Sequence, residues 1–185
     1  MAIEYIEACA MWAKVFDLAA GQVEEGIFHD DGDKQIKTYK IDFPKSGKRI
    51  VALSSRPANL RGKQGVIVID EAAFAPDLPG LLKAALAMLM WGDKVRIIST
   101  HDGDSNPFNE LINEVRSGKR GGTVHRVPLA DAVADGLFRR VCLRRGIEWT
   151  RAAEDAWVAS VRNFYGDDAA EELDVIPSQG CGAFL

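Results

Sequence analysis

Two adjacent carboxylates, Asp70 and Glu71, follow a run of four branched apolar residues at 66–69. A carboxylate at the end of such a run can hold a hydrated magnesium ion, because Mg²⁺ prefers oxygen ligands and keeps most of its waters. A second carboxylate beside it can polarise an attacking water molecule. Asp70 is therefore the candidate metal ligand, and Glu71 is the candidate catalytic carboxylate.

This order of residues is the Walker B arrangement of an ATPase. Four consecutive branched residues without polar alternation predict a strand that is buried on both faces, as in a parallel sheet covered by helices. Such a strand would deliver Asp70 and Glu71 to one rim of the sheet. A core strand that ends in a solvated acidic pair is the structural alternative.

The polar loop at 54–65 contains candidates for contact with phosphate. It follows a predicted strand at 49–55 and would share the rim with Asp70 if the two strands are parallel neighbours. An exposed basic loop without a ligand is the alternative. The loop's hydroxyl and basic side chains are Ser54, Ser55, Arg56, Arg61 and Lys63.

The residues after the two carboxylates predict a strand-helix-strand unit. Residues 78–90 have almost no polar face and predict a buried helix, and residues 94–100 predict a strand. A right-handed crossover would bring the ends of both strands to the same rim. The residues that then arrive near the carboxylates are Ser99, Thr100 and His101.

Other elements follow from periodicity and capping residues. The expected strands and helices are a helix over 3–18, strands on both sides of a polar turn at 29–33 (the second at 36–43), a helix from Pro107, a strand at 123–129, a helix over 131–145 and a helix after Thr150.

Several patterns that look like metal or phosphate sites fail on their spacing. His29 lies in a polar turn without soft ligands nearby, and Pro107 stands where a calcium loop from Asp102 needs glycine. The Gly47-Lys48 pair lacks the earlier glycine of a Walker A loop, and a strand follows it instead of a helix. No Walker A loop is present in this sequence.

The net charge of the 185 residues is -4. The molecule as a whole therefore lacks the basic character of a nucleic-acid-binding protein, and any DNA contact must come from a local patch. One helix end offers such a patch, although positive charge there also complements the helix dipole. Its residues are Arg139, Arg140, Arg144 and Arg145.

The three cysteines, Cys9, Cys142 and Cys181, are far apart and form no C-x-x-C pair. This spacing argues against a zinc knuckle or a disulfide framework and suits a reducing cytoplasm. No apolar stretch is long enough to span a bilayer. A soluble, cytoplasmic protein without membrane contact is expected.

Four segments in this order resemble the ATPase domain of phage large terminase subunits, in the branch found in Mu-like phages and prophages. The resemblance implies an α/β fold of the P-loop NTPase type, with additional-strand, RecA-like topology and a mainly parallel sheet covered by helices. The segments are Ser54-Ser55 with Arg61-Gly62, Asp70 to Phe74, Ser99 to Gly103, and Asn106-Pro107-Phe108.

The same resemblance implies a motor that uses ATP and Mg²⁺ to drive double-stranded phage DNA into a procapsid within the bacterial host cell. The implied partners are the small terminase subunit, the portal and further copies of the chain. Asp70 would be the Walker B magnesium ligand, bound through water, and Glu71 the catalytic carboxylate. The implied coupling residues, which sense the γ-phosphate, are Ser99 and Thr100 with His101 beside them.

The nucleotide-binding candidates in the preceding loop are Ser55, Arg56 and Arg61. Arg61 stands at the Arg-Gly position of the family, and nucleotide, DNA and a neighbouring subunit all remain open as its partner.

The sequence departs from the family because it contains neither the Walker A loop nor a nuclease domain. The expected organisation is a partial ATPase domain at 1–165, incomplete at its N-terminus, with a helix end and linker at 166–185. Walker B residues act only when other groups hold the phosphates, so this chain alone is expected to hydrolyse ATP poorly or not at all. The alternatives are a fragment of a helicase-like ATPase and a non-catalytic nucleotide- or DNA-binding module.

Overall fold

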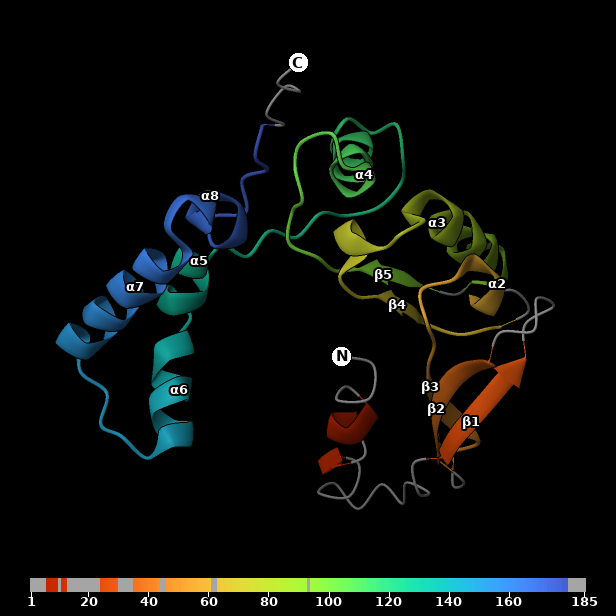
Figure 1. Ribbon diagram of the computed structural model, residues 1–185, viewed down its shortest axis with the longest axis horizontal. Coiled ribbons are helices and arrows are strands. Elements are labelled where there is room, and N and C mark those ends of the chain that lie inside the picture. Colours follow the sequence, from red (N-terminus) through yellow and green to blue (C-terminus); the bar gives the residue numbers. More distant parts are fainter. Residues whose placement is uncertain are drawn as a thin grey trace. The chain divides into compact units, whose positions relative to one another are not determined.

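The computed structural model divides the chain into two compact units. Unit 1 contains Met1–Ile67 and Pro79–Arg96, and unit 2 contains Val68–Leu78 and Ile97–Leu185. Figure 1 shows a β-sheet in unit 1 and most of the helices in unit 2. The residues that the structure describes are 6–9, 11–12, 24–29, 35–43, 46–60, 63–92 and 94–179.

An antiparallel sheet in the order β1-β2-β3 forms in unit 1. Its strands are β1 (Glu24–His29), β2 (Gln35–Phe43) and β3 (Lys48–Ala52). The register places Ile41 opposite Ile50, and fully buried Ile41 packs in one cluster with fully buried Ile6. Residues 6–9 and 11–12 are helical, whereas the rest of the helix predicted over 3–18 and the turn at 30–34 lie outside the described residues.

Among the described strands, the one at 49–55 is not a parallel neighbour of the one at 66–69, so the condition set for placing the 54–65 loop beside Asp70 is not met by strand pairing. The first of these strands is β3, which pairs antiparallel with β2. A tight turn joins β2 to β3. In it the Ser46 N–H donates to the Phe43 carbonyl at 3.1 Å, and Gly47 takes a φ of 65°. So short a connection can only make a hairpin, because parallel strands need a crossover of a dozen or more residues.

Strands β4 (Ile67–Ile69) and β5 (Val95–Ile97) form a second sheet. The Ile67 N–H donates to the Lys94 carbonyl at 2.9 Å, and the Ile98 N–H donates to the Ile69 carbonyl at 2.9 Å, as in a parallel ladder. The α/β class and a small parallel sheet are thus confirmed. The single mainly parallel sheet of a P-loop NTPase is not found among the described strands, of which three are antiparallel.

Helix α3 (Leu78–Leu86), continued by the 3₁₀ turn η2 (Ala87–Trp91), connects these two strands as predicted. Its buried side chains are Leu78, Leu81, Leu82, Ala85 and Met88.

The prediction that β4 is buried on both faces is wrong. Ile67 and Ile69 are buried, but Val66 and Val68 are 59% and 44% exposed. Alternate side chains of a strand point to opposite faces, so only one face of β4 is covered by the described residues.

Five α-helices follow β5 in the described part of unit 2. Helix α4 begins at Pro107, and the Asn106 side chain caps it by accepting the Phe108 N–H at 2.9 Å. Gly136, with a φ of 87°, divides the single helix predicted over 131–145 into two. The five helices are α4 (Pro107–Arg116), α5 (Leu129–Ala134), α6 (Leu137–Arg145), α7 (Arg151–Tyr165) and α8 (Ala169–Glu172).

The strand predicted at 123–129 does not form, because these residues find no ladder partner in the described chain and Pro128 has no N–H to donate. The segment instead runs against the end of α8. The Leu129 N–H donates to the Leu173 carbonyl at 2.7 Å, and the Arg126 guanidinium donates to the Asp174 carbonyl. None of the described helices has the length and hydropathy that crossing a bilayer requires.

The cap of α7 gives a test of this description. The Thr150 hydroxyl oxygen accepts the Ala153 N–H at 3.1 Å. Thr150→Ala should lower the free energy of unfolding by about 1 kcal/mol, whereas Thr150→Ser should stay within about 0.5 kcal/mol of the parent chain. Urea unfolding followed by circular dichroism measures both. Equal stability of the alanine and serine variants would contradict the cap.

Candidate functional site

Asp70 and Glu71 follow β4 directly, and both lie in unit 2. Asp70 is exposed and Glu71 is half-buried, and Asp70 Oδ1 accepts the Glu71 N–H at 3.2 Å. Neither carboxylate forms an ion pair with a basic side chain in the part of the chain that the structure describes. Their charge is therefore not neutralised by those residues.

The backbone of Glu71 is left-handed, with φ 52° and ψ 46°. Among the described residues, Val175 is the other non-glycine residue with a positive φ. This conformation costs a residue with a Cβ atom about 1–2 kcal/mol, so surrounding contacts must hold it. The chain then enters the short 3₁₀ turn η1 (Ala72–Phe74), in which Ala72 and Ala73 are buried.

Side chains from two later segments hold that turn in place. The Ala73 N–H donates to Ser99 Oγ at 3.1 Å, and the Asn106 Nδ2 donates to the Ala73 carbonyl at 3.0 Å. A third bond runs from the Ala72 N–H to the Ile98 carbonyl at 3.1 Å. We call the pair Ser99 and Asn106, with their bonds to Ala73, the Ala73 clamp. The structure thus brings Ser99 against the turn that carries Glu71.

Asn106 fills three roles at once. Its Oδ1 caps α4, and its Nδ2 donates to Asp102 Oδ2 at 3.1 Å as well as to Ala73. The Asn-Pro pair signals a helix start in the sequence. The contact of Asn106 with Ala73, 33 positions earlier, has no signature in the local sequence and was not predicted.

His101 is buried, unlike half-buried Thr100 beside it. Its ring lies 5.8 Å from the ring of Phe108, and Nδ1 has no hydrogen-bond partner. Burial lowers the pKa of His101, and the charges of Arg116 and Arg126 add to this effect against the opposing charge of Glu171. The imidazole is therefore neutral near pH 7.

The loop after His101 is tied to the segment at 171–178. Glu171 Oε1 accepts the Gly103 N–H at 2.7 Å and the Ser178 N–H at 3.0 Å, and the Asp104 N–H donates to the Ser178 carbonyl at 2.9 Å. Burial raises the pKa of Glu171, but the hydrogen bonds from Gly103 and Ser178 outweigh it, so the net pKa is below its ordinary value.

The phosphate-binding candidates of the preceding loop belong to unit 1. Ser55 and Arg56 are exposed there, and Ser54 accepts hydrogen bonds from the Asn59 side chain at its carbonyl and its hydroxyl, at 3.2 and 2.7 Å. Arg61 lies outside the described residues. The meeting of these residues with Asp70 stays a prediction.

The donors at the acidic turn suit a hydrated magnesium ion better than a metal held by protein ligands alone. Within the described ranges, no three His, Cys, Asp or Glu side chains gather as a metal site. Magnesium commonly needs only one or two carboxylates, because waters and substrate phosphates complete its shell. Exposed Asp70 with Glu71 beside it fits that requirement.

The structure so far defines an α/β protein with an acidic pair at the carboxyl end of a parallel strand. The chain is also similar in sequence to known phage and prophage proteins. The chain is 51% identical over 187 residues to the Mu-like prophage FluMu protein gp28 of Haemophilus influenzae. It is 51% identical over 189 residues to a protein of Escherichia phage Mu named "Probable terminase, large subunit gp28".

Both alignments cover the whole chain, which spans 36% and 34% of the lengths of these relatives. The chain is therefore similar, along its full length, to about a third of each of these two gp28 proteins, and the predicted resemblance to a Mu-like phage terminase large subunit is confirmed. No family model matches the chain, and no solved structure matches it.

Substitution can separate the helix cap that Asn106 Oδ1 provides from the bonds that its Nδ2 donates. Asn106→Ser keeps a good helix cap but cannot reach the Ala73 carbonyl, so it should lose about 1 kcal/mol of stability. Asn106→Ala loses the cap as well and should lose about 2 kcal/mol. Urea unfolding monitored by circular dichroism gives both values. A serine variant as stable as the parent would show that the bond to Ala73 does not hold the turn.

Because His101 is neutral in the folded chain, we expect the free energy of unfolding to depend on pH. Because its pKa is lowered from 6.5 in the folded chain, the unfolded chain takes up a proton first as the pH falls. The stabilisation is complete above pH 6.5 and is lost as the pH drops through the folded pKa. Urea unfolding between about pH 7.5 and about pH 5 should show this fall, weakened in His101→Gln. Exposed His125 gives the control: a His125→Gln variant that flattens the profile equally would contradict the assignment.

Proposed function

We propose that this chain carries the Walker B and coupling residues of a viral DNA-packaging motor, in which ATP hydrolysis drives the translocation of double-stranded DNA. The observation that supports this most directly is the bond between Ser99 and the turn after Glu71, which joins the ends of two parallel strands. The 51% identity to the phage Mu protein supports the same role.

The roles of the acidic pair follow from their chemistry. Asp70 would hold hydrated Mg²⁺ through its waters, and Glu71 would accept a hydrogen bond from the attacking water and orient it. Bound Mg²⁺ would neutralise charge on the phosphates of ATP. The left-handed backbone fixes the direction in which Glu71 leaves the strand.

The Ala73 clamp offers a route from hydrolysis to movement. A displacement of the Glu71 turn would act on Ser99 and Asn106 through their bonds to Ala73. The loop between Ser99 and Asn106, which contains Thr100 and buried His101, would transmit this displacement to Glu171 through the Gly103 N–H. In this proposal the coupling residues sense the state of the acidic turn through backbone hydrogen bonds.

The groups that hold the nucleotide lie outside this acidic turn. Ser55, Arg56 and Arg61 are proposed to contact ATP, and the phosphates would need further donors because the sequence has no Walker A loop. The proposed partners are double-stranded phage DNA, the small terminase subunit, the portal of the procapsid and further copies of the chain, in the cytoplasm of the bacterial host. Strand separation by the motor would favour a helicase-like ATPase instead.

Substitution of the acidic pair tests the assignment. Asp70→Asn should abolish the Mg²⁺-dependent part of ATP binding by calorimetric titration, because the amide cannot hold the hydrated ion. Glu71→Gln should leave the affinity for ATP within about threefold of the parent value, because Glu71 orients the attacking water and does not hold the nucleotide. Exposed Asp131→Asn on α5 is the control for loss of a charge.

Hydrolysis should be measured on the chain joined to the remaining sequence of the phage Mu relative. Glu71→Gln should lower kcat by a factor of about 10² or more. Hydrolysis that survives this substitution, or Mg²⁺-dependent binding that survives Asp70→Asn, would count against the assignment. ATP binding without hydrolysis in the joined chain would favour a non-catalytic module.

A further inference from the structure

Helix α6 carries an unusual concentration of positive charge. Four of its nine residues are arginine, and it contains neither a lysine nor an acidic residue. All four arginines are exposed, although the net charge of the whole chain is -4. We call these four residues, Arg139, Arg140, Arg144 and Arg145, the α6 arginine surface.

Three other arginines of unit 2, Arg120, Arg151 and Arg162, form ion pairs with carboxylates. Arg120 pairs with Glu114 at 2.7 Å, and Arg162 pairs with Asp174 at 2.6 Å. Within the described part of the chain, no residue of the α6 arginine surface forms an ion pair with a carboxylate. The surface therefore carries positive charge that its own surroundings do not cancel.

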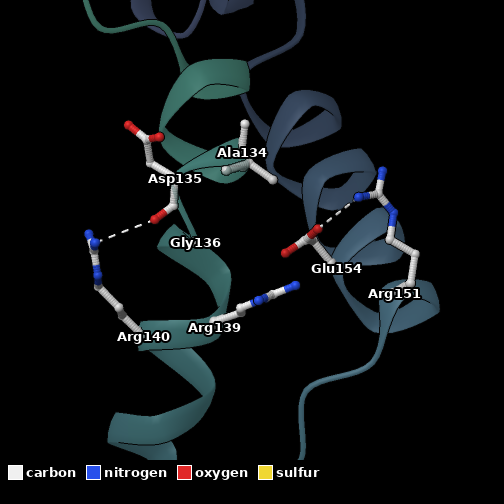
Figure 2. Close-up of a pocket in the computed structure, with 8 residues that line it drawn as sticks. Ala134, Asp135, Gly136, Arg139, Arg140, Arg151 and Glu154 are labelled. Carbon is white, nitrogen blue, oxygen red and sulfur yellow. Dashed lines mark hydrogen bonds and ion pairs between the residues drawn. The ribbon is translucent and has the colours of Figure 1, made fainter.

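Neutral groups hold the first two arginines in place. Arg140 Nη2 donates to the Asp135 carbonyl at 3.3 Å, and the Arg139 guanidinium lies 4.2 Å from the centre of the Trp149 ring. Figure 2 shows the Arg139 side chain pointing toward α7 and the Arg140 side chain reaching toward the Asp135 carbonyl. The guanidinium groups keep further N–H donors for a ligand.

Two acidic residues, Asp135 and Glu154, line this pocket, and the Glu154 carboxylate is already engaged. Glu154 is 4% exposed, and its two oxygens accept the Trp149 Nε1–H at 3.0 Å and an Arg151 N–H at 3.2 Å. Figure 2 shows the Arg151 bond on the α7 side of the pocket, which has a volume of about 380 Å³. Glu154 thus stabilises its own helix end more than it neutralises α6.

Helix stability does not explain the whole α6 arginine surface. Arg144 and Arg145 lie in the last turn, where positive charge complements the helix dipole. Arg139 and Arg140 lie in the first turn, where the dipole disfavours positive charge. Arg140 and Arg144 are also like charges at i,i+4, which repel each other on one face of the helix. A bound anion would remove both penalties.

We propose that the α6 arginine surface binds the backbone phosphates of double-stranded DNA. Guanidinium groups match phosphate with two parallel hydrogen bonds, which suits a surface built from arginine without lysine. Arg140 and Arg144, which share one face of the helix, cover about 6 Å of helix axis, the length of about two phosphates on one strand. Contacts of this kind position a duplex without reading its sequence.

This inference rests on the proposed function for the identity of the duplex, which would be the DNA that the motor moves. The surface lies on α6, and the acidic turn lies after β4, so the two sites use different residues. Each can therefore be removed without touching the other.

Fluorescence anisotropy with a labelled duplex of about 30 base pairs tests the proposal. Arg140→Gln/Arg144→Gln should weaken binding about tenfold or more, because two charge-assisted contacts are lost. The slope of log affinity against log salt should become shallower by about 1.8, which is about 0.9 for each phosphate contact. Circular dichroism and thermal unfolding show whether the variant keeps its fold.

The matched control is Lys119→Gln/Arg120→Gln, which removes the same charge from two side chains that are paired with Glu114. This variant should bind duplex as the parent chain does. Equal weakening in both double variants, absence of duplex binding by the parent, or binding to phosphatidylserine vesicles in place of duplex would overturn the proposal.

Asp70→Asn separates this inference from the proposed function. It should leave the affinity for duplex unchanged, since Asp70 does not belong to the α6 arginine surface. Mg²⁺-dependent ATP binding that survives Asp70→Asn, together with duplex binding that depends on the α6 arginines, would leave this inference standing and contradict the ATPase assignment. Loss of Mg²⁺-dependent ATP binding in Asp70→Asn, together with duplex binding that the α6 substitutions do not change, would overturn this inference alone.

Discussion

A buried backbone group must find a hydrogen-bond partner, and at Ala73 this requirement organises the acidic turn. The 3₁₀ turn is too short to satisfy Ala73 internally, so its N–H and carbonyl bind Ser99 and Asn106, which follow it by 26 and 33 residues. The end of β5 and the start of α4 must therefore meet at this turn. The left-handed backbone of Glu71 is held by the same contacts.

The hydrogen bonds at this turn continue into the rest of unit 2. Asn106 joins the acidic turn to α4, and the loop between Ser99 and Asn106 continues through Gly103 to Glu171. Each such bond contributes only about 1 kcal/mol to stability after the loss of water contacts. The buried ring of His101, which belongs to this loop, lies 5.8 Å from the buried ring of Phe108 on α4, and this contact reinforces the loop.

Local patterns in the sequence predicted much of the fold. Thr150 marked the start of α7, Pro107 marked that of α4, and apolar periodicity indicated the β4-α3-β5 unit. Strand partners were not predicted, because pairing depends on distant residues: β3 joins β2, and 123–129 has apolar residues but no partner. In the site, residue types indicated Asp70, Glu71 and Ser99. The reach of Asn106 to Ala73 and the burial of His101 depend on tertiary contacts and had no local signal.

The left-handed backbone at Glu71 also bears on how this position can change during evolution. Glycine, asparagine and aspartate adopt that conformation more readily than glutamate, so drift alone would favour them at position 71. A copy of the gene released from selection could gain stability by replacing the glutamate. Glutamate retained here in diverging prophage copies would therefore record continued selection on its carboxylate, whereas glycine or asparagine would mark a copy whose acidic turn is no longer maintained.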